Sequence, residues 1–357
     1  MPHQSKNASS KKSEKSKNRG ISLKELAAHL GLSPTSLSIV LNDAPAASAI
    51  PQETKDRIFE AAAQYNYRPN YFARSLRAQR SFTFGVIVPE LSDGYSAMVL
   101  NGVEAALSKE GFFYLTASHL HRDDLLEHHP KMLLERQVEG IIAVDTPIRF
   151  QTHLPVVSVS GHEAIEGVTN VVLNHQHAAE LSIGHLFTLG HRKIAIIKGQ
   201  DFSSDTEVRW ETIVQAMSKR GMKPDKKLVS QLEGDIPSPE IGYIAAQKIL
   251  STKKPFTALF AFNDVSAIGA IRALQEAGLR VPEDVSVLGF DDIYSAAFHN
   301  PALTTIRQPL FEMGVLAAKT LLERVSKNQP NDDAAIPQTL TVEPTLIVRQ
   351  STAPVKK

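Results

Sequence analysis

The sequence predicts an all-helical headpiece at the N-terminus, followed by an α/β core made of two doubly wound parallel-sheet subdomains. Three observations lead to this fold class. Residues 21–65 contain three short stretches in which apolar residues recur at helical spacing. From Phe82 onward, apolar runs of strand length alternate with stretches of helix length, which is typical of parallel sheets with crossover helices. These strands are too many for one regular sheet, so the core is expected to contain two.

Composition excludes several classes of protein. The 357 residues are 42% hydrophobic, which is ordinary for a globular protein, and include no cysteine. A disulfide framework, a thiol nucleophile and a zinc–thiolate site are therefore excluded. No apolar run is long enough to span a membrane, and the N-terminus lacks the apolar segment of a signal peptide. We expect a cytoplasmic protein with no membrane partner.

Charge is unevenly distributed along the chain. Residues 1–80 contain thirteen Lys and Arg but six Asp and Glu, a net charge of +7, whereas the whole chain carries +1. A basic N-terminal part on an acidic core suits a protein whose N-terminus meets a polyanion such as DNA. Residues 1–20 have almost no apolar side chains and are expected to be a disordered basic tail.

Residues 21–42 predict two short helices joined by a tight turn. Ser22 is expected to cap the first helix, and Gly31 to end it in the left-handed conformation. Ser33 is expected to cap the second helix, with Pro34 in its first turn. The pattern fits a helix-turn-helix, whose second helix enters the DNA major groove, although a helical hairpin inside a larger domain has the same pattern.

The remaining elements define the predicted domain boundaries. A third helix is expected over residues 51–65, and a short helix over 70–77 that has little to pack against except DNA or a second copy of itself. The predicted divisions are the tail 1–20, the headpiece 21–69, the hinge helix and linker 70–81, the core 82–350 and the tail 351–357. Within the core, residues 82–172 and 309–326 are assigned to one subdomain, and 174–307 and 337–350 to the other.

Polar residues follow the predicted core strands, at the sheet edge where ligands of doubly wound folds bind. His119, His121, His128 and His129 are also close in sequence, but no carboxylate or thiol accompanies them at fixed helical spacing, so no metal site is expected. A P-loop, a dinucleotide fingerprint and a nucleophile elbow are absent, and no cofactor is expected. The adjacent Asp291 and Asp292 would point apart on a strand end, which argues against an enzyme.

The chain resembles the lac-repressor/gal-repressor (LacI/GalR) family of bacterial transcription regulators from Ile21 to about Arg349. The motifs that carry the resemblance are GLSPTSLSIVLN, QETKDRIFEAAAQYNYRPN, ARSLR, LLERQVEGII, HLFTLGHRKIAII, AFNDVSAIGAIRALQEAGLRVPEDVSVLGFDD and PALTTIRQPLFEMG. The resemblance implies a core like that of periplasmic sugar-binding proteins. It also implies a homodimeric repressor that binds a near-palindromic double-stranded operator and a small-molecule effector. The C-terminal STAPVKK carries no heptads, so a dimer is expected rather than a tetramer.

The resemblance implies specific DNA contacts. Base contacts are expected from Pro34, Thr35 and Ile39, phosphate contacts from Ser33, Ser38, Asn42 and Asn70, and a minor-groove wedge from Ala73 and Leu76. Ile39 stands where the family usually has an arginine that reads guanine through two hydrogen bonds, so a different operator base is expected there. An ordinary contact between hinge and core is the alternative for Leu76.

The resemblance also implies an effector site in the cleft between the subdomains. Its expected residues are Asp93, Tyr95, Ser96, Arg209, Asn263 and Asp291. Carboxylate, amide and guanidinium groups with one aromatic residue suit a sugar or sugar derivative, because each hydroxyl both donates and accepts. Instead of binding the effector, Asp291 could cap a helix, and Arg209 could form a surface ion pair. Ser160 and Gly161 replace a sugar-contacting Asp-Arg pair of the family, which argues against a simple hexose.

Overall fold

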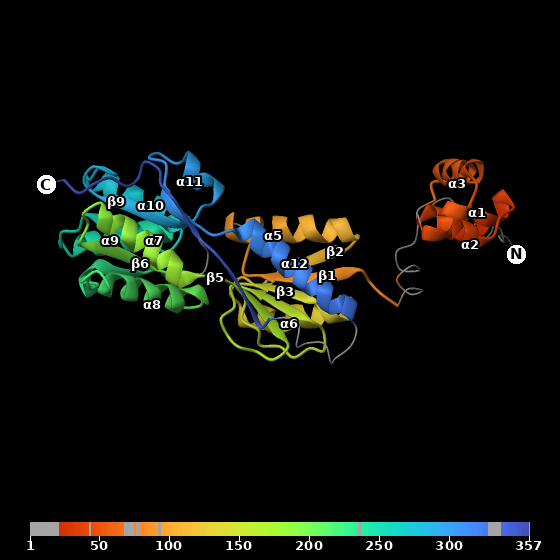
Figure 1. The fold of residues 1–357 in the computed structure, drawn as a ribbon, viewed down its shortest axis with the longest axis horizontal. Helices are drawn as coiled ribbons and strands as arrows, with labels where there is room; N and C mark the ends of the chain where they lie inside the picture. The colour runs from red at the N-terminus through yellow and green to blue at the C-terminus, as the bar shows by residue number, and fades with distance from the viewer. Residues whose placement is uncertain are drawn as a thin grey trace, which may run out of the picture. The chain divides into compact units, whose positions relative to one another are not determined.

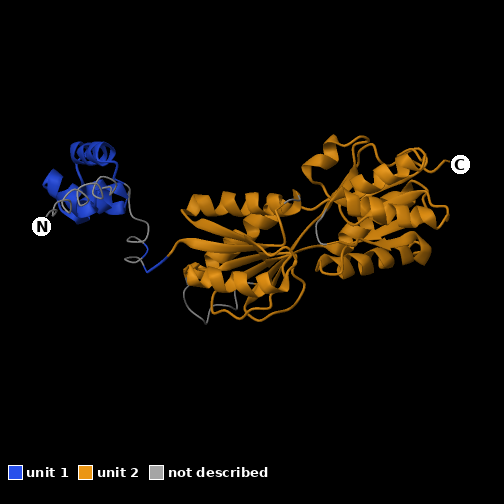
Figure 2. Cartoon of the chain, turned by 180° about the vertical axis from the view of Figure 1, so that it is seen from behind, with its two compact units in different colours: residues 1–80 blue, residues 81–357 orange. Residues whose placement is uncertain are grey.

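The chain forms two compact units, residues 1–80 and residues 81–357, in the computed structural model (Figure 2). The structure describes residues 21–42, 44–67, 75, 79–91, 94–234, 238–327 and 337–356. The expected tail 1–20 and the expected site residues Asn70, Ala73, Leu76 and Asp93 lie outside these residues, as does nearly all of the expected hinge helix. No helix within the described ranges is long and apolar enough to cross a membrane.

The headpiece is a small three-helix unit. Its helices are α1 (Leu23–Leu30), α2 (Pro34–Leu41) and α3 (Gln52–Gln64), with the 3₁₀ helix η1 (Pro45–Ala49) between α2 and α3. Leu26, Leu37 and Ile58 are fully buried where the three helices meet. Burial of these side chains holds together helices that are each too short to be stable alone.

The predicted helix ends of the headpiece are confirmed. The Glu25 N–H donates to Ser22 Oγ at 3.3 Å, and the Ser22 N–H donates to Glu25 Oε2 at 2.8 Å, which completes a capping box. Gly31 follows α1 with φ +66°, in the left-handed region. The Ser36 N–H donates to Ser33 Oγ at 3.0 Å and caps α2, which fixes the start of the second helix.

The first lobe of the second unit is built on a six-stranded sheet with the strand order β11-β5-β4-β3-β1-β2, in which all pairs are parallel. The strands are β1 (Thr83–Val88), β2 (Phe113–Ser118), β3 (Ile141–Val144), β4 (Val156–Val159), β5 (Val168–Leu173) and β11 (Thr339–Val342). Helices α5 (Gly94–Leu107) and α12 (Leu310–Lys327) lie side by side over one face, and α6 (Asp123–Glu135) packs against β1 and β2 on the other (Figure 1).

The second lobe has a sheet with the order β12-β10-β9-β8-β6-β7, in which β12 runs antiparallel to β10 and the other pairs are parallel. The strands are β6 (Ile194–Lys198), β7 (Val229–Gln231), β8 (Ala258–Ala261), β9 (Ser286–Asp291), β10 (Thr304–Arg307) and β12 (Thr345–Ile347). Helices α7 (His175–Thr188) and α8 (Asp205–Ser218) pack together, as do α9 (Pro239–Ser251) and α10 (Asp264–Glu276). Short helix α11 (Tyr294–Phe298) follows β9, and η2 (Ser108–Glu110) and η3 (Lys226–Leu228) complete the elements of this unit.

The prediction that residues 337–350 belong to the second subdomain is wrong for β11. This strand pairs in parallel with β5 of the first lobe, and the chain then crosses to the second lobe, where β12 pairs with β10. Residues 174, 308–309 and 343–344 are therefore the three crossings between the lobes. Both strands are short and form an edge of their sheet, and their local sequence does not encode which sheet they join.

The contact between α5 and α12 depends on two glycines. A Cβ added to Gly102 would lie 2.0 Å from the Phe311 carbonyl oxygen, and one added to Gly314 would lie 2.0 Å from the Val99 carbonyl oxygen. The two backbones therefore approach more closely than any larger residue allows. This close packing joins the C-terminal helix rigidly to the first helix of the core.

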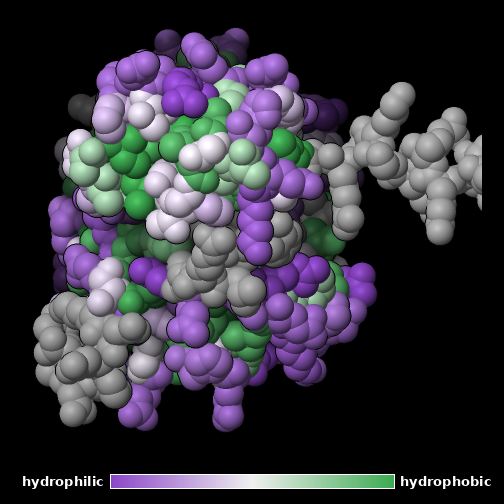
Figure 3. Space-filling model, turned by 90° about the vertical axis from the view of Figure 1, so that its right-hand side faces the viewer, coloured by the Kyte–Doolittle hydropathy of each residue, from purple (hydrophilic) through white to green (hydrophobic). Residues whose placement is uncertain are grey.

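On the face shown in Figure 3, polar side chains predominate, with groups of hydrophobic side chains among them. Isolated apolar residues on a surface are normal. Two large ones on the same short helix α11 stand out from that background, because Tyr294 is 71% exposed and Phe298 is 89% exposed. This pair is a candidate contact surface.

Candidate ligand-binding cleft and DNA-binding helix

A small cavity lies between the two lobes, beyond the carboxyl ends of their strands. It encloses about 60 Å³, space for on the order of four water molecules. Its lining comprises Pro89, Glu90, Tyr95, His121, Asp145, Gln200, Phe202, Ser203, Asp205, Arg209, Phe262, Asn263, Asp291 and Gln308. Because both lobes contribute to the lining, a ligand bound here would contact both of them.

Four of the six expected effector residues meet in this cavity: Tyr95, Arg209, Asn263 and Asp291. Ser96 is buried in α5 and is not part of the lining. The physical reason is helical geometry, since adjacent residues of a helix point about 100° apart and only one of the pair can face the cavity. The first lobe therefore contributes Tyr95 from this helix.

Arg209 is buried, so the alternative that it forms a surface ion pair is wrong. Its Nη2 donates to Asp205 Oδ2 at 2.9 Å, and its Nη1 donates to the Phe262 carbonyl oxygen at 2.6 Å. The guanidinium carbon lies 3.7 Å from the centre of the Phe290 ring and 4.3 Å from that of Phe262. The guanidinium plane is thus held by an ion pair, a carbonyl and two rings, which positions it for planar recognition of a ligand.

Asp291 and Asn263 have different local roles. Asp291 accepts a hydrogen bond from Gln308 Nε2 at 2.7 Å, while the N-cap position of α11 belongs to Ile293. Capping of that helix therefore does not account for Asp291. Asn263 is itself a helix cap, because its Oδ1 accepts from the Ser266 N–H at 2.9 Å. The cap fixes the asparagine at the cavity wall and directs its oxygen toward the helix.

A loop of the second lobe touches the first lobe across the cavity. Asp145 accepts hydrogen bonds from Ser204 Oγ at 2.9 Å and from Ser203 Oγ at 3.3 Å. His162 Nε2 lies 2.7 Å from Asp205 Oδ1, and the rings of His121 and Phe202 are 3.8 Å apart between centres. These direct contacts hold the lobes together in a closed arrangement.

Several of these contacting residues were not singled out from the sequence, among them Asp145, Phe202 and Asp205. A usable signal was present, because each follows the carboxyl end of a predicted core strand, where a ligand site is expected. Position at a strand end does not by itself distinguish a lining residue from its neighbours, because the loop conformation decides which side chain turns inward.

Acidic groups dominate the cavity. Burial and the nearby Asp205 raise the pKa of Asp145 to about 6. Burial acts in the same direction on Asp205, but His175, His162 and Arg209 outweigh it and hold the pKa of this carboxyl well below its usual value. The lining contains four carboxyl side chains, including Glu90 and Asp291, and one guanidinium. A neutral or cationic polar ligand fits this balance better than an anion.

Helix α2 presents the expected DNA-contacting residues. Leu37 and Val40 are buried against the other helices, while Ser33, Pro34, Thr35 and Asn42 are exposed, and Ser38 and Ile39 are half-buried. The Asn42 amide donates to the Ser38 carbonyl oxygen at 2.7 Å, which orders the end of the helix. One side of α2 thus forms the headpiece core, and the other carries short polar groups with one aliphatic residue.

Known proteins are similar to this chain in both fold and sequence. A family model described as a periplasmic binding protein-like domain matches residues 183–352. The chain is 33% identical to the HTH-type transcriptional repressor PurR of Haemophilus influenzae over 341 residues, which cover 92% of this chain and 98% of that protein. A crystal structure of the lac repressor dimer bound to operator and the anti-inducer ONPF has a TM-score of 0.81 at 24% identity, covering 94% of this chain and all of that one. The transcriptional regulator CelR in complex with cellobiose has a TM-score of 0.67 at 26% identity, covering 93% and 99% of the two chains.

A helix-turn-helix headpiece joined to a two-lobed core with a polar interlobe cavity defines a ligand-responsive transcription regulator. The chain belongs to the LacI/GalR family of bacterial transcription regulators, as expected from its motifs. Its relatives are transcriptional repressors, and the chain is a regulator rather than an enzyme.

Proposed function

We propose that this regulator represses carbohydrate-related genes and that a neutral sugar or sugar derivative, bound in the interlobe cavity, sets its affinity for operator DNA. The observation that carries the proposal is the cavity lining, in which the carboxylates can accept from hydroxyls while Arg209 and the side-chain NH₂ of Asn263 can donate to them. Phe202, Phe262 and Tyr95 offer apolar faces to a sugar ring. The similar CelR was crystallised with cellobiose, which supports this class of ligand.

The effector would act through the angle between the lobes. A ligand that contacts Tyr95 on one lobe and Arg209 on the other binds best at one lobe separation, so its binding energy selects that separation. The same change would alter the spacing of two hinge segments, one per protomer, and thereby operator affinity. Effector and operator must then influence each other's affinity by the same factor.

A ligand screen tests the proposed effector class. Neutral mono- and disaccharides, sugar phosphates and nucleobases are compared by thermal shift, and each hit is then added to the protein–operator complex. We expect a neutral sugar to raise the melting temperature in a concentration-dependent way and to change operator affinity, because bound ligand stabilises the native state. Stabilisation by sugar phosphates or nucleobases alone would show that the effector is not a neutral sugar.

The DNA-binding form is proposed to be a cytoplasmic, nucleoid-associated homodimer on a near-palindromic operator. One headpiece reads only a half-site, so two protomers are needed for the whole site. We assign Pro34, Thr35 and Ile39 to base contacts and Ser33, Ser38, Asn42 and Asn70 to phosphate contacts. Tyr294 and Phe298 are assigned to the dimer interface, because both are large, apolar and strongly exposed on α11.

The proposed wedge formed by Leu76 beside Ala73 is tested with Leu76→Ala. An apolar wedge unstacks a base step only at the operator centre, so we expect specific binding to weaken on the order of 10- to 100-fold while non-specific binding stays nearly unchanged. Both affinities are measured by fluorescence anisotropy at one fixed salt concentration. As a control, Lys24→Ala, at an exposed position of α1, should weaken both kinds of binding alike. Equal losses for Leu76→Ala would assign this leucine to general hinge packing.

A further inference from the structure

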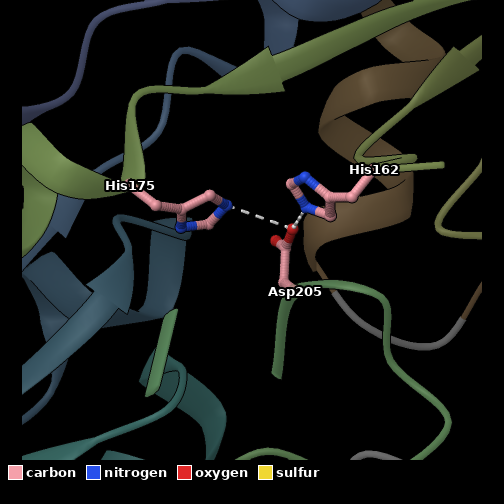
Figure 4. A group of neighbouring side chains, drawn as sticks. All are labelled: His162, His175 and Asp205. Carbon is pink, nitrogen blue, oxygen red and sulfur yellow. Dashed lines mark hydrogen bonds and ion pairs between the residues drawn. The ribbon is translucent and has the colours of Figure 1, made fainter. Parts of the chain in front are cut away.

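His162, His175 and Asp205 bring together three potential metal-ligating atoms (Figure 4), and Asp205 also lines the cavity. These atoms all lie within 4.8 Å of one another, and the residues form the one such group of three within the described part of the chain. Asp205 Oδ1 is 2.7 Å from His162 Nε2 and 3.2 Å from His175 Nε2. The sequence predicts no metal site among the histidines of residues 119–129, and the present three residues are too far apart along the chain to form a recognisable motif.

We propose that these residues form a binding site for a divalent transition-metal cation, with Zn²⁺ as the best match, that joins the two lobes. The proposal goes beyond the proposed function and does not depend on the identity of the effector. His162 follows β4 of the first lobe, His175 begins α7 next to a crossing between the lobes, and Asp205 begins α8 of the second lobe. A bound ion would therefore add a bond between parts of the core that otherwise meet through hydrogen bonds.

The distances suit a tetrahedral ion. Ligand atoms about 2.0–2.1 Å from zinc in tetrahedral geometry lie about 3.3 Å from one another. The distance of 3.2 Å from Asp205 Oδ1 to His175 Nε2 matches that value, the distance of 2.7 Å to His162 Nε2 is shorter, and all three ligand atoms lie within 4.8 Å of one another. His162 is the most exposed of the three ligands. Its side chain is 21% exposed, whereas those of His175 and Asp205 are 4% and 6% exposed. His162 is therefore the ligand that would move to admit the ion.

Neighbouring groups hold two of the ligands in place. The Asp205 carboxylate accepts from Arg209 Nη2 through Oδ2, which leaves Oδ1 facing both imidazoles. The His175 ring is nearly parallel to that of Phe290, with 15° between the planes and 6.4 Å between the centres. The hydrogen-bonded carboxylate has the outer-shell support that metal ligands commonly have, whereas the His175 ring is positioned by packing, because its Nδ1 is buried without a hydrogen-bond partner among the described residues.

The ligand types select the class of metal. Two imidazoles and one carboxylate match Zn²⁺ and related transition-metal ions, whereas Mg²⁺ and Ca²⁺ prefer oxygen ligands throughout. Asp145 and Asp291 line the same cavity as Asp205, and their negative charge attracts a cation to it. Three protein ligands leave a fourth position for water or for an oxygen atom of the effector.

The test uses untagged full-length protein that has been stripped with a chelator. Zinc is titrated by calorimetry, and the metal content is measured by elemental analysis after dialysis. We expect one Zn²⁺ per chain and a higher melting temperature with zinc, while Mg²⁺ should have no effect at the same concentration. His162→Ala should weaken zinc binding by at least the roughly 100-fold that loss of an outer-shell partner can cost. Asp205→Asn should also weaken zinc binding. If this substitution of a buried residue impairs folding, His162→Ala still tests the proposal, because His162 is partly exposed.

The matched control is the double substitution His128→Ala and His129→Ala on α6, which removes two histidines outside the proposed site. This variant should keep the zinc content and affinity of the wild type. The absence of cysteine from the chain means that no thiolate can compete for the metal. Wild-type protein without zinc after dialysis, or a His162→Ala variant with unchanged affinity, would overturn the proposal. These measurements involve neither sugar nor DNA, so their outcome is separate from that of the proposed function.

Discussion

Arg209→Ala is expected to abolish the effector response and to lower the free energy of unfolding by about 3–5 kcal/mol. The guanidinium and its partner Asp205 are both almost completely buried, so the substitution leaves a carboxylate in the interior without its cation. It also removes the group that we expect to donate to the ligand from the second lobe. Unfolding is measured with denaturant, and the effector response as the change in operator affinity when ligand is added.

Two further variants separate these effects. Arg272→Ala removes an exposed ion pair with Glu276 within helix α10, and we expect it to change the free energy of unfolding far less than Arg209→Ala and to leave the effector response intact. Adding Asp205→Asn to Arg209→Ala should recover part of the lost stability, because the unpaired charge is removed, but should not restore the response. An unchanged ligand affinity in Arg209→Ala would remove this arginine from the effector site.

Phe298→Lys is expected to convert the dimer into a monomer and to weaken operator binding by about 100- to 10,000-fold. Burial of Tyr294 and Phe298 against a second copy would stabilise the dimer, and a lysine in the same place would carry an unpaired charge into the interface. A monomer binds one half-site only and loses the effective concentration that links the two headpieces. Molar mass is measured by light scattering, and operator affinity by anisotropy at fixed salt.

Val348→Lys is the matched control for this substitution. Val348 is also apolar and exposed, but it follows β12 rather than lying on α11. It should leave both the molar mass and the operator affinity as in the wild type. If Phe298→Lys remains a dimer with full affinity, the interface lies elsewhere, and the exposed aromatic residues of α11 have another role.

Local features of this protein were predictable from its sequence because they depend on neighbouring residues. The caps at Ser22 and Ser33 and the left-handed Gly31 follow from hydrogen bonding and sterics within a few residues. Most of the alternating strands and helices of the core follow from hydrophobic periodicity in the same way. The lining residues Asn263 and Asp291 lie in motifs that resemble the family, whereas Arg209 was found from its position in the family and Tyr95 because it follows the first core strand.

Contacts between distant parts of the chain could not be predicted in this way. Residues 339–342 were assigned to the wrong sheet, because the choice between two sheet edges is made by tertiary packing rather than by local preference. The contact of His162 with Asp205 joins residues 43 positions apart on different lobes. No spacing along the sequence indicates such a pair, since it exists only when the lobes are closed.

The family, the helix-turn-helix and most of the order of elements could be predicted from the sequence, because hydrophobic periodicity, helix capping and motifs depend on residues that are close together in the chain. The tertiary structure decided which charged side chains share the cavity, with Arg209 paired to Asp205 and two histidines brought to the same carboxylate. Burial and proximity arise only when separate elements pack. Together they shift the pKa values of the carboxyl groups in the cavity and so determine the charge of the site.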